Sequence, residues 1–213
     1  MRFFRPLWFS RLLYPDALFR VKTKEKVLYL TFDDGPVAEI TFPLLRILSD
    51  NMVKAVFFCN GEAAVANPQI MSAIKTSGHV IGNHGFSHPD GVLKNTKEYL
   101  EDINKASEVT SKKIFRPPFG RMKRSQYLML KAIYKIIMWD IMPYDFDPEF
   151  GAVRSLAVVK KLMRPGSIIV LHDNNKSNML ELIEEFIIYS KKEGYRFDII
   201  PELLSHKSPE PST

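Results

Sequence analysis

Short apolar runs alternate along the chain with stretches whose apolar residues have helical spacing. The runs lie at 27–30, 55–59, 80–81, 114–115, 136–139, 167–171 and 196–200. Successive apolar positions without polar alternation are typical of strands buried on both faces. Seven such strands, alternating with helices, predict a parallel sheet in an α/β fold, either a barrel or a sheet close to closure.

The segments between the runs predict helices. These are expected between Pro36 and Asp50, at 68–77, 96–110, 125–134 and 152–163, and over a last stripe of Met179, Leu182, Ile183, Phe186 and Ile187. Thr96 and Ser125 are placed to cap two of these helices. Asn60 is expected only to end the strand at 55–59.

Composition is that of an ordinary globular protein, with 213 residues, 46% apolar and 25% charged. The chain has no internal repeat and no linker-like run, which predicts one catalytic domain over 26–204. An apolar and basic segment at 1–25 is expected to pack on that domain, and the polar tail at 205–213 is expected to be disordered. The single cysteine, Cys59, ends an apolar run, which indicates a buried, inert thiol and excludes an internal disulfide.

Positive charge is concentrated at the N-terminus. Seven basic and two acidic residues leave +5 of the net +6 within the first 26 residues. A solvated basic surface is the commoner explanation, and weak association with an anionic polymer or lipid surface is the alternative. Nothing in the sequence resembles a nucleic-acid-binding motif, and no apolar stretch is long enough for a transmembrane span.

The same segment does not read as a cleavable signal peptide. Arg5, Arg11 and Pro15 interrupt its apolar patches, and no small-residue cleavage site follows. Residues 7–21 are therefore expected to pack on the body of the domain. The sequence predicts neither a compartment nor an oligomeric state.

Two adjacent carboxylates end the first predicted strand. Asp33 and Asp34 are followed by Gly35-Pro36, through which no strand continues. Neighbouring residues in extended chain point opposite ways, so one carboxylate is free to bind a cation while the other faces a substrate. Turn chemistry is an equal alternative from this segment alone.

Reactive side chains follow four other predicted strands. His84 and His88 are four residues apart after the strand at 80–81, and Asp34 would complete a set of two imidazoles and one carboxylate. Three protein ligands with an open position are what a catalytic zinc-like ion requires.

Arg116 follows the strand at 114–115 and is a candidate to orient Asp33, with an ordinary surface arginine as the alternative. Three acids, Asp140, Asp145 and Asp147, follow the strand at 136–139, and some of them are expected to be simple loop acids. His172 stands directly after a strongly apolar strand, where a functional role is favoured.

Five segments, in order, resemble the motifs of the polysaccharide deacetylases, a family of metal-dependent carbohydrate esterases acting on N-acetylated sugars. They are TFDDGP (31–36), HGFSH (84–88), RPPFG (116–120), YDF (144–146) and LHD (171–173). The resemblance covers 27–197 and implies a distorted seven-stranded (β/α) barrel. It also implies a metal ion bound by Asp34, His84 and His88, usually zinc, with cobalt, nickel or manganese as alternatives.

The resemblance implies roles for the remaining motif residues as well. Asp33 would be the general base, positioned by Arg116, and His172 the general acid. An acid of the fourth motif region would tune His172, with Asp145 preferred and Asp140 as the alternative. The substrate side would consist of the Phe119 backbone N–H at the oxyanion, Leu171 at the acetyl pocket and Phe146 on the groove wall.

Two residues depart from the family pattern. Gly85 stands where Ser or Thr is usual, which removes a hydroxyl from the loop, and Phe146 stands where Trp is usual, which alters one wall of the groove. The expected activity is removal of N-acetyl groups from a GlcNAc-containing glycan, whether peptidoglycan, chitin-like oligomer or exopolysaccharide, with release of acetate. Alternatives are hydrolysis of a small non-sugar amide and a non-catalytic glycan-binding barrel.

Overall fold

The computed structural model describes residues 2–203, so the tail predicted at 205–213 lies outside the described residues. Seven strands form one sheet: β1 (Val27–Asp33), β2 (Val56–Cys59), β3 (Val80–Asn83), β4 (Ile114–Phe115), β5 (Lys135–Ile136), β6 (Ile168–His172) and β7 (Arg196–Phe197). The strand order is β5-β4-β3-β2-β1-β6, and β7 pairs with the start of β1. Every pair is parallel, which confirms the predicted α/β fold.

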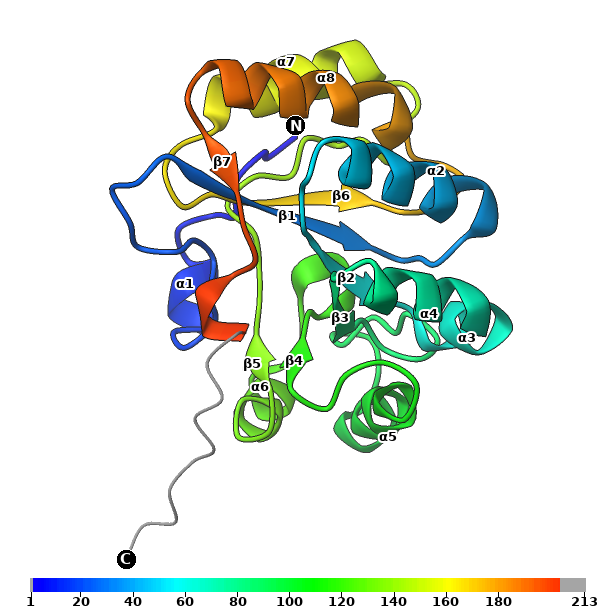
Figure 1. Ribbon diagram of the computed structural model, residues 1–213. Coiled ribbons are helices and arrows are strands. Elements are labelled where there is room, and N and C mark those ends of the chain that lie inside the picture. The colour runs from blue at the N-terminus through cyan, green and yellow to red at the C-terminus, as the bar shows by residue number, and fades with distance from the viewer. Residues whose placement is uncertain (1, 204–213) are drawn as a thin grey trace, which may run out of the picture.

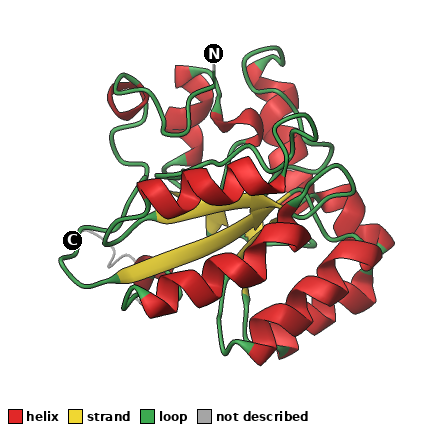
Figure 2. Ribbon diagram, turned by 90° about the horizontal axis from the view of Figure 1, so that it is seen from above, coloured by secondary structure: helices red, strands yellow, loops and turns green. Residues whose placement is uncertain are grey.

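Helices surround the curled sheet (Figures 1 and 2). They are α1 (Ser10–Leu13), α2 (Ala38–Asp50), α3 (Gly61–Ala66), α4 (Pro68–Thr76), α5 (Thr96–Ser107), α6 (Arg124–Leu130), α7 (Ala152–Leu162) and α8 (Met179–Lys192), with short 3₁₀ turns η1 (Pro118–Gly120) and η2 (Pro201–Leu203). Figure 1 shows α2, α7 and α8 along one side of β1 and β6, with α3 to α6 beside the remaining strands. This is a distorted (β/α) barrel.

Irregular chain bridges the gap between the edge strands β5 and β6. Leu18 pairs in parallel with Ile137, directly after β5, and Arg20 forms an antiparallel bridge with Ser167, directly before β6. The N-terminal segment therefore lies between the two strands that a regular barrel would pair with each other.

Strand β1 is buried along its whole length, as its unbroken apolar run predicts. Leu28, Leu30 and Phe32 pack in a core shared with α2, α4 and α8. Val27 and Tyr29 point to the opposite face and pack with residues of β2 and β6. Because apolar contacts hold both faces, the position of the two carboxylates at the end of β1 is fixed.

Three helix caps differ from the predictions. Asn95, not Thr96, caps α5, with its side chain accepting a backbone N–H of the first turn at 2.9 Å. Ser125 lies inside α6 and shares a hydrogen bond of 3.0 Å with the Thr96 hydroxyl. Asn60 caps α3, a helix that the sequence did not predict, as well as ending β2. Asn is the better capping residue of the adjacent pair Asn95-Thr96, in agreement with the cap that α5 uses.

Only part of the N-terminal segment at 7–21 is buried. Tyr14, Phe19 and Val21 are 5%, 3% and 8% exposed, whereas Trp8 and Leu12 are 76% and 65% exposed. Within residues 2–203, no helix combines the length and the apolar character that crossing a bilayer requires.

Candidate active site

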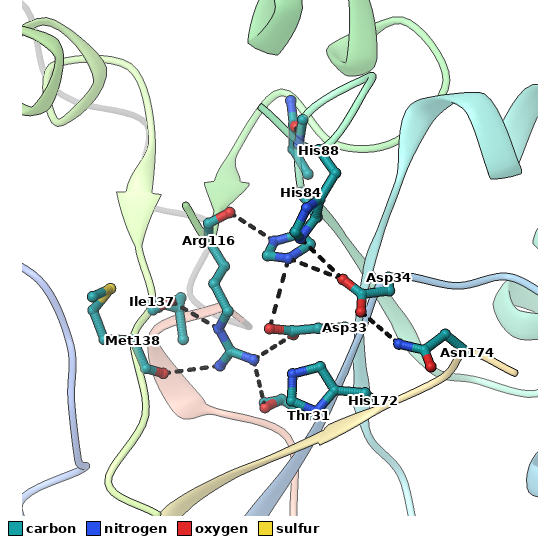
Figure 3. Close-up of polar contacts among 12 residues, drawn as sticks. Thr31, Asp33, Asp34, His84, His88, Arg116, Ile137, Met138, His172 and Asn174 are labelled. Carbon is teal, nitrogen blue, oxygen red and sulfur yellow. Dashed lines mark hydrogen bonds and ion pairs between the residues drawn. The ribbon is translucent and has the colours of Figure 1, made fainter. Parts of the chain in front are cut away.

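The carboxyl ends of β1, β3, β4 and β6 meet at one edge of the sheet and bring the predicted side chains together (Figure 3). Asp33 is the last residue of β1 and is only 4% exposed. Asp34 follows with φ of 79°, a left-handed conformation that turns its carboxylate away from the strand direction. The paired carboxylates therefore face different partners, as expected for neighbouring residues of a strand end.

Asp34, His84 and His88 form a compact cluster that fits a divalent metal ion. Their ligand atoms all lie within 4.8 Å of one another. Asp34 Oδ1 lies 3.5 Å from His84 Nε2 and 3.2 Å from His88 Nε2. A tetrahedral zinc ion with bonds of about 2.0–2.1 Å holds its ligand atoms about 3.3–3.4 Å apart. The two imidazoles and the carboxylate are thus already spaced as ligands of one ion.

Hydrogen bonds around the cluster leave its ligand atoms free. The ring Nδ1 of His84 lies 2.9 Å from the carbonyl oxygen of Arg116, so this nitrogen carries the proton and Nε2 presents its lone pair to the cluster. Asn174 Nδ2 donates to Asp34 Oδ2 at 2.7 Å. The other oxygen, Asp34 Oδ1, is buried and accepts no hydrogen bond from the described residues. An orphaned buried carboxylate oxygen beside two imidazoles is a reason to expect a cation.

Charge reinforces this arrangement. Burial tends to raise the pKa of Asp34, but His84 and His88, when their Nε2 atoms are protonated and donate to it, and the charge of His172 outweigh burial and hold that pKa well below its usual range. Asp34 is therefore ionised, as a metal ligand must be.

The loop between the two histidines is shaped by Gly85 and Asp102. Gly85 has φ of +78°, and a Cβ there would lie 2.7 Å from Pro89 Cδ, so this position requires glycine. Asp102, on α5, accepts the backbone N–H of Phe86 at 2.6 Å and the hydroxyl of Ser87 at 2.6 Å. The loop at 84–88, which departs from the family pattern at Gly85, is thus held by hydrogen bonds to the carboxylate of Asp102. The sequence analysis did not predict this role for Asp102.

Left-handed backbone conformations gather at this edge. Besides Asp34, the residues His88, Phe119 and Tyr144 have φ of 55°, 57° and 62°. Such conformations cost free energy in residues other than glycine, and they persist where the surroundings hold them. All four residues line the same pocket.

Arg116 is completely buried and holds Asp33 in place. Its Nη1 donates to Asp33 Oδ1 at 2.6 Å and to the Thr31 hydroxyl at 2.8 Å. Its Nε and Nη2 donate to the carbonyl oxygens of Ile137 and Met138 at 3.1 and 2.8 Å (Figure 3). The second oxygen, Asp33 Oδ2, is left facing the cluster, 3.8 Å from His84 Nε2. The geometry is that of an oriented carboxylate with one oxygen free to accept a proton.

His172 ends β6, next to Asp33 in the register of the sheet, and pairs with Asp145. Its Nδ1 lies 3.0 Å from Asp145 Oδ1, and its backbone N–H donates to Asp145 Oδ2 at 2.7 Å. Burial lowers the pKa of His172, but the charges of Asp145, Asp34 and Asp33 outweigh it and raise the pKa to about 9. His172 is therefore an imidazolium at neutral pH, with Nδ1 occupied and Nε2 available to the pocket.

Asp140, the alternative partner of His172, is engaged elsewhere. Its carboxylate pairs with Arg5 at 2.6 Å and with Arg164 at 2.5 Å, and it accepts the Ser167 hydroxyl at 2.8 Å. The geometry thus favours Asp145 over Asp140 as the acid that affects His172.

The pocket above these groups has a volume of about 500 Å³, within the usual size range of small-molecule sites. Its walls are aromatic and apolar side chains together with the clustered polar groups: Asp33, Asp34, His84, His88, Pro117, Phe119, Gly120, Trp139, Met142, Tyr144, Phe146, Val170, His172, Asn174 and Lys176. The ring of Phe119 packs edge-on against His88 at 4.6 Å, and that of Phe146 against His172 at 4.7 Å. The backbone N–H of Phe119 donates no hydrogen bond to any residue within 2–203.

Leu171 is not on the pocket wall, which corrects its predicted position. It is fully buried in the core shared with α2 and α8, whereas Val170 lines the pocket. Residues two apart in a strand share a face, so Val170 lies on the side of His172 and Leu171 points to the helices.

Asp173, the last residue of the LHD motif, is a further buried carboxylate close to the site, for which the sequence predicted no role. Its Oδ2 accepts the Thr41 hydroxyl at 2.8 Å, and a Cβ at Gly35 would lie 2.3 Å from that oxygen. Burial raises the pKa of Asp173 to about 7. Asp173 therefore packs under the turn that carries Asp34, and Gly35 allows that close approach.

Comparison with known proteins shows the family to which the chain belongs. A profile of the polysaccharide deacetylase family matches residues 20–134. The chain is 30% identical over 204 residues to the peptidoglycan-N-acetylmuramic acid deacetylase PdaA of Bacillus subtilis, covering 90% of this chain and 76% of that protein. The chain belongs to the polysaccharide deacetylase family.

Solved structures share the fold. A crystal structure of a peptidoglycan N-acetylglucosamine deacetylase, in complex with a naphthalenyl N-hydroxybenzamide, has a TM-score of 0.84 and 30% sequence identity, covering 92% of this chain and 96% of that one. A mutant of a CE4-family pseudoenzyme has a TM-score of 0.79 and 25% identity, covering 90% and 71%. The distorted barrel is thus found in both an enzyme and a pseudoenzyme, so catalysis has to be argued from the site.

Proposed function

We propose that the protein is a metal-dependent deacetylase that hydrolyses the acetamido group of a GlcNAc-containing glycan. Asp34, His84 and His88 hold one divalent ion, with zinc preferred. The observation that carries this proposal is the convergence of this cluster with Asp33 and His172 in one pocket. A proton acceptor and a proton donor flanking one open site are what amide hydrolysis requires.

The bound ion would polarise the acetyl carbonyl and lower the pKa of a bound water toward about 7. Asp33 accepts a proton from the water that attacks the carbonyl carbon, through the oxygen that Arg116 leaves free. The unpaired backbone N–H of Phe119 donates to the oxyanion that develops on the carbonyl oxygen.

His172 supplies the proton that the leaving nitrogen needs. An amine leaves poorly as an anion, so cleavage of the C–N bond is accompanied by proton transfer from His172 Nε2 to the nitrogen. Asp145 holds the ring by Nδ1 and stabilises its protonated form. The products are acetate and the free amino sugar.

The substrate class follows from the relatives and from the pocket walls. The similar proteins act, by name, on N-acetylmuramic acid and on N-acetylglucosamine of peptidoglycan. Tyr144, Phe146 and Trp139 give the pocket flat apolar surfaces against which a sugar ring can pack. We therefore place an N-acetylated sugar of a glycan, rather than a small free amide, in the site.

Acetate release tests this assignment. The purified protein, loaded with zinc, is incubated in parallel with GlcNAc oligomers, with peptidoglycan strands and with N-methylacetamide. We expect acetate from at least one of the two glycans and none above background from the simple amide, with activity abolished by a chelator. Release from the amide alone, or glycan binding without any acetate, would overturn the proposal.

Removal of Asn174 is expected to weaken metal binding. The Asn174→Ala substitution deletes the hydrogen bond to Asp34 Oδ2 at 2.7 Å, so the ligand is no longer held in orientation. Loss of such a supporting partner typically costs about 10- to 100-fold in metal affinity. Isothermal titration of the metal-free protein with zinc measures the change, and Asn175→Ala at the exposed neighbouring position is the matched control. Equal affinity in the Asn174→Ala variant and the wild type would contradict the assigned role.

Removal of Asp145 is expected to shift the alkaline limb of the pH profile. His172 donates its proton only below its pKa, so activity falls as the pH rises through about 9 in the wild type. In Asp145→Asn the charge that raises this pKa is lost, and the limb should move by about 1–3 pH units toward lower pH. Profiles of kcat/KM against pH measure the shift. Asp140→Asn should leave the position of the limb unchanged, because Asp140 pairs with Arg5 and Arg164 instead.

A further inference from the structure

Four large apolar side chains near the N-terminus are exposed together. Trp8, Phe9, Leu12 and Leu13, called here the N-terminal patch, are 76%, 43%, 65% and 46% exposed. They fall within six consecutive residues around the short helix α1, which Figure 1 places at the side of the molecule away from α3 and α4. Scattered apolar residues are normal on a protein surface, but a contiguous group of this kind marks an interaction site.

The patch is held in shape by the body of the protein. The backbone N–H groups of Leu12 and Leu13 both donate to the carbonyl of Phe9 at 3.0 Å. Directly after the patch, the buried Tyr14 hydroxyl donates to the Met122 carbonyl at 2.8 Å. The apolar side chains are thus presented on an ordered turn anchored to the domain.

Contacts before the patch also fix it. Arg5 pairs with the buried Asp140 at 2.6 Å and donates to the Leu162 carbonyl at 2.5 Å. The backbone N–H of Phe3 donates to the Tyr144 hydroxyl at 3.1 Å. The segment is therefore fastened on both sides of the exposed side chains, which leaves those side chains available to an external surface.

Free positive charge accompanies the patch. Arg11, Lys22 and Lys24 are exposed, and within residues 2–203 none of them forms an ion pair. The acidic residues of the same segment are neutralised, since Asp16 pairs with Lys131 at 2.7 Å and Glu25 with Arg196 at 2.6 Å. The N-terminal segment that carries the patch is thus apolar and positively charged.

We propose that the N-terminal patch docks the protein on an anionic lipid surface. Trp8, Phe9, Leu12 and Leu13 enter the boundary between headgroups and acyl chains, and the unpaired cations of the same segment contact lipid phosphates. The four-residue helix lies in the interface and does not cross it. This role is separate from the deacetylase chemistry, because none of these side chains lines the pocket.

Charge argues for lipid over the other occupants. A symmetric dimer would place the patch of one copy against that of the other and bring the unpaired cations of both together, which is unfavourable. A soluble anionic polymer would satisfy the cations and leave the apolar side chains in water. An anionic bilayer offers phosphates to the cations and an apolar interior to the side chains of the patch.

Vesicle flotation tests the proposal with the full chain. We expect co-flotation with vesicles of phosphatidylglycerol and phosphatidylcholine in equal parts, and binding weaker by about tenfold or more to phosphatidylcholine alone. The Trp8→Ser/Leu12→Ser double variant should lose binding to the anionic vesicles while keeping acetate release from soluble GlcNAc oligomers. The matched control is Met52→Ser/Val153→Ser, at positions that are 86% and 82% exposed elsewhere on the surface, and it should bind as the wild type does.

Tryptophan fluorescence gives a second readout. The chain has two tryptophans, of which Trp139 lies in the pocket. Anionic vesicles should shift the emission of the wild type to shorter wavelength and leave that of Trp8→Phe unchanged. The proposal is overturned if the wild type does not float with anionic vesicles at low salt. It is equally overturned if the double variant still floats, or if the double variant differs only by converting a dimer to a monomer.

Discussion

Replacing Asp33 by Asn should leave a protein that is folded and metal-loaded but does not release acetate. The amide keeps the shape of the side chain and an oxygen for the Arg116 hydrogen bond at 2.6 Å, but it cannot accept the proton of the attacking water. Loss of a general base typically costs about 10²- to 10⁴-fold in rate. Initial rates of acetate release, measured with the metal content of the same sample, give the result.

Asp147→Asn is the matched control for this substitution, because Asp147 lies at the surface and pairs with Arg2 at 2.6 Å, outside the pocket lining. Its activity should equal that of the wild type. A metal-loaded Asp33→Asn protein with undiminished turnover would refute the role of Asp33 as the base.

Replacing Arg116 by Met is expected to destabilise the fold as well as stop turnover. The substitution leaves the Asp33 carboxylate buried and unpaired, and it deprives the carbonyl groups of Ile137 and Met138 of their donors. Removing one partner of a buried ion pair typically lowers the free energy of unfolding by about 3–5 kcal/mol. In a chain of this size that lowers Tm by roughly 10 °C. Thermal unfolding of the metal-free proteins measures the loss.

Two controls make this result specific. Arg46→Met removes an exposed arginine whose pair with Asp50 has a separation of 3.7 Å, and it should cost less than about 1 kcal/mol. The double variant Arg116→Met/Asp33→Asn no longer carries the unpaired Asp33 carboxylate. It should therefore be more stable than the Arg116→Met single variant. A loss below about 1 kcal/mol for Arg116→Met alone would mean that this buried network contributes little to the fold.

The fold could be predicted because its strands are buried on both faces. Continuous apolar runs such as 27–30 and 167–171 have few alternatives to buried parallel strands, and they form the neighbouring strands β1 and β6, which are buried almost throughout. Short strands with mixed composition were less well defined: the run at 196–200 forms a strand only at Arg196–Phe197. The role of Leu18 between the edge strands depends on tertiary contacts and has no local sequence signal.

The cluster at the strand ends could be predicted because parallel strands bring their carboxyl ends to one edge. The residues that hold the cluster in place could not be predicted from the sequence. Asn174 and Asp102 act through loop geometry that spacing in the sequence does not reveal. The prediction that Leu171 lines the pocket is wrong. Successive residues of β6 point to opposite faces, so Val170 faces the pocket and Leu171 faces the core.

The most direct measurement compares metal content with acetate release during removal and restoration of the ion. The wild type is stripped with a chelator and titrated back with zinc, and each point is analysed for zinc by mass spectrometry and for acetate released from the best glycan. We predict that activity returns in proportion to bound zinc and reaches its maximum at about one ion per chain, while His84→Ala and His88→Ala recover neither. Full activity in the stripped protein, or zinc bound equally well without these histidines, would contradict a single catalytic ion held by Asp34, His84 and His88.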